Sequence, residues 1–183
     1  QAHLRLGKLL LEQGNRAEAQ TRLKQAVSLA PQDAEAHYWH GVTLEKGGRT
    51  REAAAEFSEA ARLEGSFADA WEQLGRALKK LGSTQEAMES FAGLAQLRPD
   101  DGNARYELGS ALAALGQLES AEEQLRAAIT LNPALPAAKR EHAEVLAALG
   151  RDDEALVAGG APGRVDHRFD QVLRAPEALA HLG

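Results

Sequence analysis

A spacing of 34 residues recurs along this chain and constrains its fold more strongly than any other feature. Two glycine columns and one alanine column keep this spacing: Gly7, Gly41, Gly75 and Gly109; Gly14, Gly48, Gly82, Gly116 and Gly150; Ala19, Ala53, Ala87, Ala121 and Ala155. Two leucine columns keep it as well: Leu10, Leu44, Leu78, Leu112 and Leu146; Leu29, Leu63, Leu97 and Leu131. Five columns in phase indicate that one structural unit has been duplicated.

Within each unit the pattern predicts two helices joined by a tight turn. The first glycine, such as Gly7, falls inside a helical run, where glycine costs about 1 kcal/mol relative to alanine. Its recurrence predicts the close approach of another helix, with the alanine twelve positions later, such as Ala19, as the facing surface. The second glycine, such as Gly14, is expected to end the first helix in the left-handed conformation. The second helix is expected to end near Leu29, because Pro31 cannot continue it.

Local composition also favours helices. Alanine and leucine carry most of the apolar content, and aromatic residues make up only 4% of the chain. Both residues cost little to place in a helix. Asn15 and Ser83 each follow a turn glycine and precede a glutamate by three positions. This is the spacing of a capping box or of a close relative, so both residues are expected to cap second helices.

The pattern resembles the tetratricopeptide repeat, whose signature runs W-x2-L-G-x2-Y, then A, F, A and P. The third unit shows it best, through Trp71, Leu74, Gly75, Leu78, Gly82, Ala87, Phe91 and Pro99. The resemblance covers about residues 1–158. It implies an all-α fold, a right-handed α-solenoid of helix-turn-helix repeats.

The expected organisation is four complete repeats, a degenerate fifth and a tail. The repeats are placed near residues 1–33, 34–67, 68–101 and 102–135, the degenerate fifth at 136–158, a Gly/Pro break at 159–163 and a helical tail at 164–183. In the tail, Val165, Phe169, Val172 and Leu173 fall on one apolar face. The tail is expected to cap the open end of the stack. The alternative is that it docks into a groove of its own or a neighbouring molecule.

Several functional classes are disfavoured by the sequence. The net charge of -6 is unlike that of a general nucleic-acid binder, and the absence of cysteine excludes disulfides and cysteine-ligated metals. No apolar run approaches the roughly 20 residues that cross a bilayer. No phosphate loop, nucleophile elbow or HExxH motif is present. His37 and His40 are spaced to share a metal, but they replace packing residues of the repeat, so core histidines are the favoured interpretation. The prediction is a protein without catalytic activity, cofactor or metal.

The resemblance implies a binding groove lined by the first helix of every repeat. The residues expected to bind a partner there are Arg5, Lys8, Tyr38, Trp39, Lys46, Gln73, Arg76, Lys79, Lys80, Asn103, Tyr106 and Arg140. Exposed aromatic and arginine side chains are typical binding anchors. Arg76, Lys79 and Lys80 are expected to attract an acidic partner or a C-terminus. The alternative is an ordinary solvated helix face. The clamp with which some relatives hold C-terminal carboxylates has no counterpart in this sequence.

The predicted function is a scaffold or adaptor that binds a protein or peptide. One alternative is self-assembly, in which the tail or an open end of one molecule fits another. A second alternative is a regulatory or substrate-docking segment of a larger enzyme. The expected setting is the bacterial cytoplasm, with the periplasm as the alternative if a signal peptide preceded Gln1.

Overall fold

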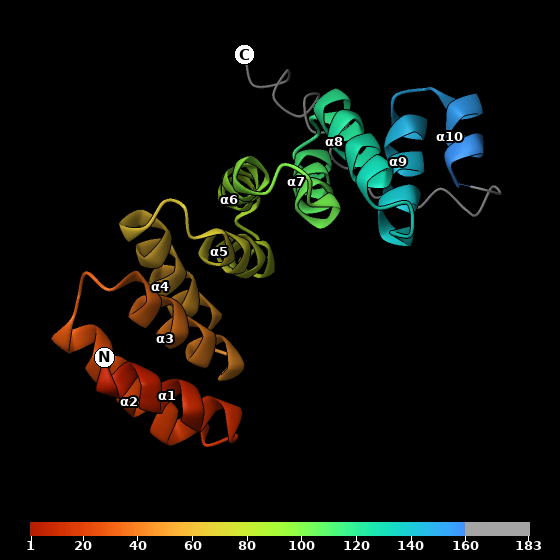
Figure 1. Ribbon diagram of the computed structural model, residues 1–183. Coiled ribbons are helices and arrows are strands. Elements are labelled where there is room, and N and C mark those ends of the chain that lie inside the picture. Colours follow the sequence, from red (N-terminus) through yellow and green to blue (C-terminus); the bar gives the residue numbers. More distant parts are fainter. Residues whose placement is uncertain (160–183) are drawn as a thin grey trace, which may run out of the picture. The chain divides into compact units, whose positions relative to one another are not determined.

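The computed structural model describes residues 1–159, and this part of the chain forms ten α-helices and no strand (Figure 1). The helices are α1 Ala2–Glu12, α2 Arg16–Leu29, α3 Ala34–Lys46, α4 Thr50–Leu63, α5 Ala68–Leu81, α6 Thr84–Leu97, α7 Gly102–Ala114, α8 Leu118–Leu131, α9 Pro136–Ala148 and α10 Asp152–Gly159. The all-α prediction is therefore confirmed. The expected tail at 164–183, and most of the expected break before it, lie outside the described residues.

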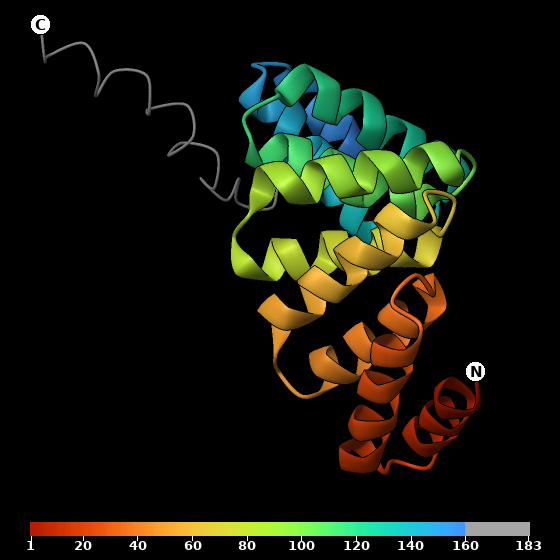
Figure 2. The same cartoon turned by 90° about the vertical axis from the view of Figure 1, so that its left-hand side faces the viewer.

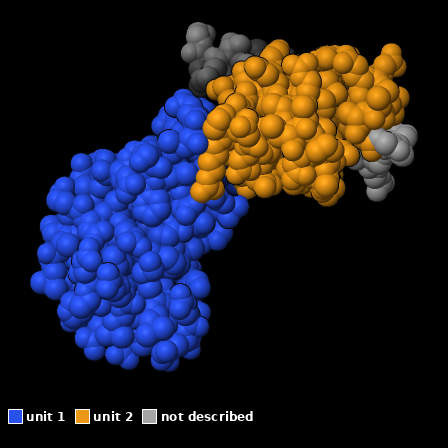
Figure 3. Space-filling model, viewed as in Figure 1, with its two compact units in different colours: residues 1–97 blue, residues 98–183 orange. Residues whose placement is uncertain are grey.

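The helices pack in consecutive pairs, so that an odd-numbered helix contacts the helix that follows it (Figure 2). The chain divides into two compact units, residues 1–97 and the residues from 98 onward (Figure 3). In the first, unit 1, α2 also packs against α3 and α4 against α5. In the second, unit 2, α8 packs against α9. No helix in the described part has both the length and the hydropathy that a membrane span requires.

A glycine in the first helix of each complete repeat lets a bulky side chain of the second helix come close. A Cβ atom on Gly75 would lie 2.6 Å from Cε1 of Phe91, and one on Gly41 would lie 2.8 Å from Cε1 of Phe57. Leu23 and Leu125 lie in the same way against the equivalent glycines. The predicted close approach is confirmed, but the facing residue is a different one. It comes sixteen positions after the glycine rather than twelve, one turn beyond the buried alanine on the same helix face.

The turn within each repeat has the same backbone structure in all five repeats. Gly14, Gly48, Gly82, Gly116 and Gly150 have φ values between 73° and 81°. At the first turn, the amide of Asn15 donates to the carbonyl of Leu10, and that of Gly14 to Leu11. These two bonds define a Schellman motif, and each of the other four turns repeats both. The predicted left-handed glycine is thus confirmed.

Helix capping differs from the prediction at Asn15, whereas the predicted cap at Ser83 stays a prediction. Asn15 precedes α2, but its side chain makes no capping hydrogen bond. Instead, Asp33 accepts a bond from the amide of Ala36 at the start of α3, and Asp101 caps α7 in the same manner. Side-chain caps are thus found at two first helices, α3 and α7, but not at α1, α5 or α9. At α2, the Schellman turn determines where the chain re-enters a helix.

Gly75→Ala is expected to destabilise the protein, because the added methyl group would overlap the fully buried ring of Phe91. Overpacking costs about 1–3 kcal/mol, and it opposes a gain in helix propensity of about 1 kcal/mol. We expect a net loss of up to about 2 kcal/mol in the free energy of unfolding, measured by urea denaturation. Gly65→Ala is the control, because Gly65 has open space around its Cα and no positive φ. Equal effects of the two substitutions would contradict the packing argument.

Candidate functional site

The first helices of unit 1 are linked to one another by ion pairs on a common face. Lys8 on α1 approaches Glu35 on α3, with 2.7 Å between Nζ and Oε1. Lys80 on α5 forms a short ion pair with Glu45 on α3. We call this surface the first-helix face of unit 1. Nine of the predicted partner-binding residues lie on these three helices: Arg5, Lys8, Tyr38, Trp39, Lys46, Gln73, Arg76, Lys79 and Lys80.

The other three predicted residues belong to unit 2. Asn103 and Tyr106 lie on α7, and Arg140 lies on α9. Tyr106 is half-buried, and its phenol donates a hydrogen bond to Glu141, a buried carboxylate on α9. Burial raises the pKa of Tyr106, and the negative charges of Glu141 and Glu107 raise it further. The tyrosine thus links the first helices of two consecutive repeats within unit 2.

Several cations that were expected to attract a partner already have acidic neighbours. Arg76 lies 2.9 Å from Glu72, measured from Nη2 to Oε1, besides the pairs of Lys8 and Lys80. The hydrogen bond from Lys8 lowers the pKa of Glu35, against the opposing effect of burial. An exposed ion pair contributes only about 0–1 kcal/mol. A partner carboxylate would therefore replace an existing acid at small cost and would gain little affinity from these cations alone.

Tyr38 and Trp39 are half-buried, not fully exposed as the anchor prediction assumed. The centre of the Tyr38 ring lies 4.9 Å from that of Phe67, 5.4 Å from that of Trp39 and 5.9 Å from that of Phe57. The Lys8 ammonium group lies 4.9 Å from the centre of the Trp39 ring, which suits a cation–π contact. Tyr38 and Trp39 thus form part of the packing of unit 1, and both keep a partly exposed surface.

One repeated interaction was missed by the sequence analysis. His37, Trp71 and Arg105 occupy one column of the repeat, and each donates a side-chain N–H to the carbonyl six residues earlier. The acceptors are Pro31, Gly65 and Pro99, at 3.1, 2.9 and 3.4 Å. We call this contact the loop tie, because it joins the first helix to the loop before it. The shared column could have revealed it, but the tryptophan position was interpreted only as packing.

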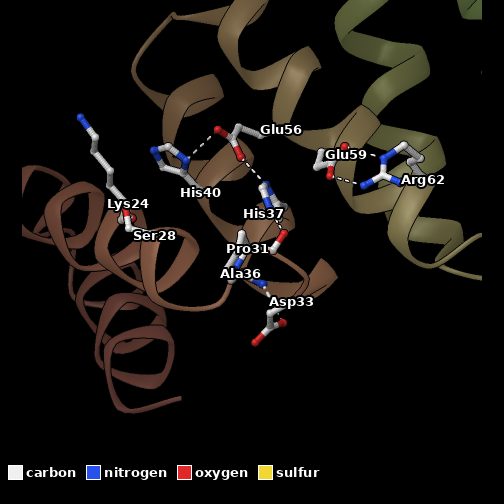
Figure 4. A network of polar contacts seen from close by, with 10 residues as sticks. All are labelled: Lys24, Ser28, Pro31, Asp33, Ala36, His37, His40, Glu56, Glu59 and Arg62. Atoms are coloured by element: carbon white, nitrogen blue, oxygen red, sulfur yellow. Dashed lines mark hydrogen bonds and ion pairs between the residues drawn. The ribbon is translucent and has the colours of Figure 1, made fainter.

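The loop tie of His37 continues into a cluster with Glu56 and His40 (Figure 4). Nδ1 of His37 lies 2.7 Å from Oε2 of Glu56. Nδ1 of His40 lies 3.1 Å from Oε1 but is not aligned for a hydrogen bond. Nε2 of His37 thus faces a carbonyl and Nδ1 faces a carboxylate, so the ring joins the loop before α3 to α4. Both histidines are buried.

The same place in the fourth repeat holds an arginine and a glutamine instead of a histidine and a glutamate. Arg105 occupies the His37 column, and its Nη1 donates to Oε1 of Gln124 at 2.9 Å. Gln124 lies 34 × 2 residues after Glu56, in the same column. In each of these two repeats, the same two positions therefore connect the first helix to the second helix, but the side chains at those positions differ. Among the described residues, no group of three or more His, Cys, Asp or Glu side chains is placed to hold a metal ion.

Comparisons with known proteins agree with the geometry. A family model for the tetratricopeptide repeat matches residues 4–66, 40–104, 72–136 and 106–159. YrrB, described as a TPR protein with an unusual peptide-binding site, is 23% identical with a TM-score of 0.80, over 96% of this chain and 90% of that one. MamA from Desulfovibrio magneticus RS-1 (residues 41 to the end) is 21% identical with a TM-score of 0.75, over 98% and 96% of the two chains. A MamA RS-1 double mutant is 20% identical with a TM-score of 0.78, over 97% and 96%. The search of curated proteins finds no match.

The Glu56 cluster is expected to make the stability of the protein depend on pH. Burial raises the pKa of Glu56, but the contacts with His40 and His37 outweigh burial and hold it below its ordinary value of 4.5. The ionised carboxylate therefore stabilises the fold above that ordinary value, and this contribution is lost as the pH falls through the lower folded value. Thermal unfolding should show that Glu56→Gln reduces the loss of stability on acidification.

Two variants serve as controls for this prediction. Glu59→Gln removes a carboxylate on the same helix that pairs with the exposed Arg62, so it should change the pH profile little. The double variant His37→Arg with Glu56→Gln copies the Arg105–Gln124 pair and should keep the loop tie without the carboxylate of Glu56. An unchanged pH profile in both Glu56 variants would show that the cluster does not contribute.

Proposed function

The chain belongs to the tetratricopeptide-repeat family, and on this premise we propose that it is a scaffold without catalytic activity, which binds a protein or peptide partner. The first-helix face of unit 1 is the proposed binding surface. The observation that carries the proposal is the linking of α1, α3 and α5 by the Lys8–Glu35 and Glu45–Lys80 pairs. These pairs join the first helices of three consecutive repeats, which supports one shared binding surface.

The chemistry of this face favours a partner with both apolar and charged side chains. Trp39 and Tyr38 supply partly exposed aromatic surface, and Lys8 lies beside the Trp39 ring. Arg5 on α1 and Lys46 on α3 are exposed and can pair with acidic side chains. Because Arg76 and Lys80 already have acidic neighbours, we propose that apolar contacts supply most of the affinity. The charged side chains then determine the position at which the partner binds along the face.

The likeness to YrrB is consistent with this proposal, because YrrB is described as having a peptide-binding site. At 23% identity the likeness concerns the fold, so the residues proposed for this chain rest on its own contacts. The capping role of the tail and the location in the cytoplasm or periplasm stay predictions.

The proposed surface can be tested with peptides selected from a random library on the purified chain. The face variant carries Arg5→Glu and Lys46→Glu, two exposed positions whose replacement should leave the fold intact. It should bind the selected peptides at least about tenfold more weakly than the wild type, which corresponds to roughly 1.4 kcal/mol. Isothermal titration calorimetry measures the affinities. Tyr38 and Tyr106 are left in place, because both pack within their units.

The matched control changes the net charge by the same amount on second helices. Lys24→Glu and Arg51→Glu alter exposed residues of α2 and α4, away from the first-helix face of unit 1. This control should keep the wild-type affinity. Equal weakening in both double variants would indicate non-specific attraction between charges, and no weakening in either would place the binding surface elsewhere.

A further inference from the structure

The carboxylate of Glu45 lies on the first-helix face of unit 1, and only one of its two oxygens has a hydrogen-bond donor. Its Oε1 accepts from Lys80 of α5. Its Oε2 is buried and meets no donor among the described residues. A buried acceptor without a donor is costly, because it has lost its bond to water and gained nothing in return. Glu45 can therefore accept one more donor, on the surface proposed to bind the partner.

The other member of this ion pair, Lys80, is the easier one to displace. Its side chain is 63% exposed, whereas that of Glu45 is 20% exposed. A lysine ammonium group is strongly hydrated and sits on a flexible stem, so it leaves an exposed pair at little cost. A cation of the partner can thus take the place of Lys80 while Glu45 stays on α3. A carboxylate of the partner bound to Lys80 would instead have to lie beside the negative charge of Glu45.

A second ion pair, formed within α5, has the same order of exposure. The side chain of Glu72 is 23% exposed and that of Arg76 is 48% exposed. The pair between α1 and α3 has the opposite order, since the side chain of Lys8 is 35% exposed and that of Glu35 is 50% exposed. In the two pairs that involve α5, the acid is therefore held near the protein and the exposed, replaceable charge is positive. This part of the face favours a positively charged group of the partner.

The unused oxygen of Glu45 distinguishes arginine from lysine. The ammonium group of Lys80 donates to Oε1 and leaves Oε2 without a donor. A guanidinium group presents two parallel N–H donors at a spacing that matches the two oxygens of a carboxylate. The last torsion of a glutamate side chain is broad, so the carboxylate can turn both oxygens toward such a group once Lys80 has left. An arginine would therefore supply the donor that Oε2 lacks.

We propose that Glu45 binds an arginine side chain of the protein or peptide partner, which displaces Lys80 and donates to both carboxylate oxygens. The inference rests on the proposed function, because it assigns one contact of the partner on the first-helix face of unit 1. The net charge of -6 also favours the approach of a cationic segment.

N-Acetyl-arginine N-methylamide tests the site without any selected peptide. Titrated into the full chain, it should shift the amide NMR signals of Glu45 and Lys80 and bind at least about fivefold more tightly than its lysine analogue. Glu45→Gln should weaken this binding at least about tenfold, since it removes the charge that strengthens the two hydrogen bonds. Lys80→Met should instead tighten the binding about threefold, because it removes the competing cation.

Two matched variants separate this site from a general attraction between charges. Lys46→Met removes the same positive charge from the residue next to Glu45, and it should change the affinity little. Glu52→Gln removes an exposed carboxylate of α4 that pairs with Arg49, and it should keep the wild-type affinity. Circular dichroism checks that each variant is folded. An unchanged affinity in Glu45→Gln, weaker binding in Lys80→Met or equal tightening in Lys46→Met would overturn the inference.

The peptides selected on the purified chain separate this inference from the proposed function. Those that bind the face variant more weakly should contain arginine. Replacing that arginine by lysine should lower their affinity for the wild type about fivefold and leave their affinity for Glu45→Gln unchanged. Face-binding peptides that are insensitive to Glu45→Gln would overturn the inference and leave the proposed function standing. Peptides insensitive to the face variant would contradict the proposed function, and the arginine probe would then decide the role of Glu45.

Discussion

The packing of a bulky side chain against a glycine in the facing helix determines the structure of each complete repeat. Phe57 and Phe91 occupy the space that a Cβ atom on Gly41 or Gly75 would fill. The paired helices therefore approach closely, and the phenylalanine rings are fully buried although the repeat contains few large side chains. The small alanines of the junctions between repeats, such as Ala60 against Ala70, then allow the next pair to pack closely as well.

Much of this fold could be predicted from the sequence, because its determinants are local and repeated. The second helices end at Leu29, Leu63, Leu97 and Leu131, as the spacing predicts. The turn glycines were predictable because a left-handed residue excludes almost every other side chain. The resemblance to the tetratricopeptide repeat then supplied the pairing of helices. The capping role of Asn15 was not predictable, because a turn that closes through backbone bonds does not require a side-chain cap.

The candidate site was predictable only in part. The repeat register placed Lys8, Tyr38 and Lys80 on first helices, but it could not show which acid each cation meets. Lys8 and Glu35 are 27 residues apart, and Lys80 and Glu45 are 35 apart. Between positions so far apart in sequence, a long charged side chain can reach several different acids. Which acid it pairs with depends on the spacing of the helices, to within a few ångströms. The sequence also could not show how exposed the aromatic rings are, because Tyr38 packs on Phe67, which lies in the loop between two repeats.

The loop tie has a consequence for how such repeats are recognised. Its acceptor is a main-chain oxygen, which every amino acid provides, so only the donor depends on the sequence. Indole, imidazole and guanidinium groups all satisfy it, although substitution tables treat tryptophan, histidine and arginine as dissimilar. Repeats can therefore share the geometry of this contact although their residues at this column look unrelated. A profile that scored the ability to donate an N–H, instead of tryptophan itself, would align the second and fourth repeats with the third.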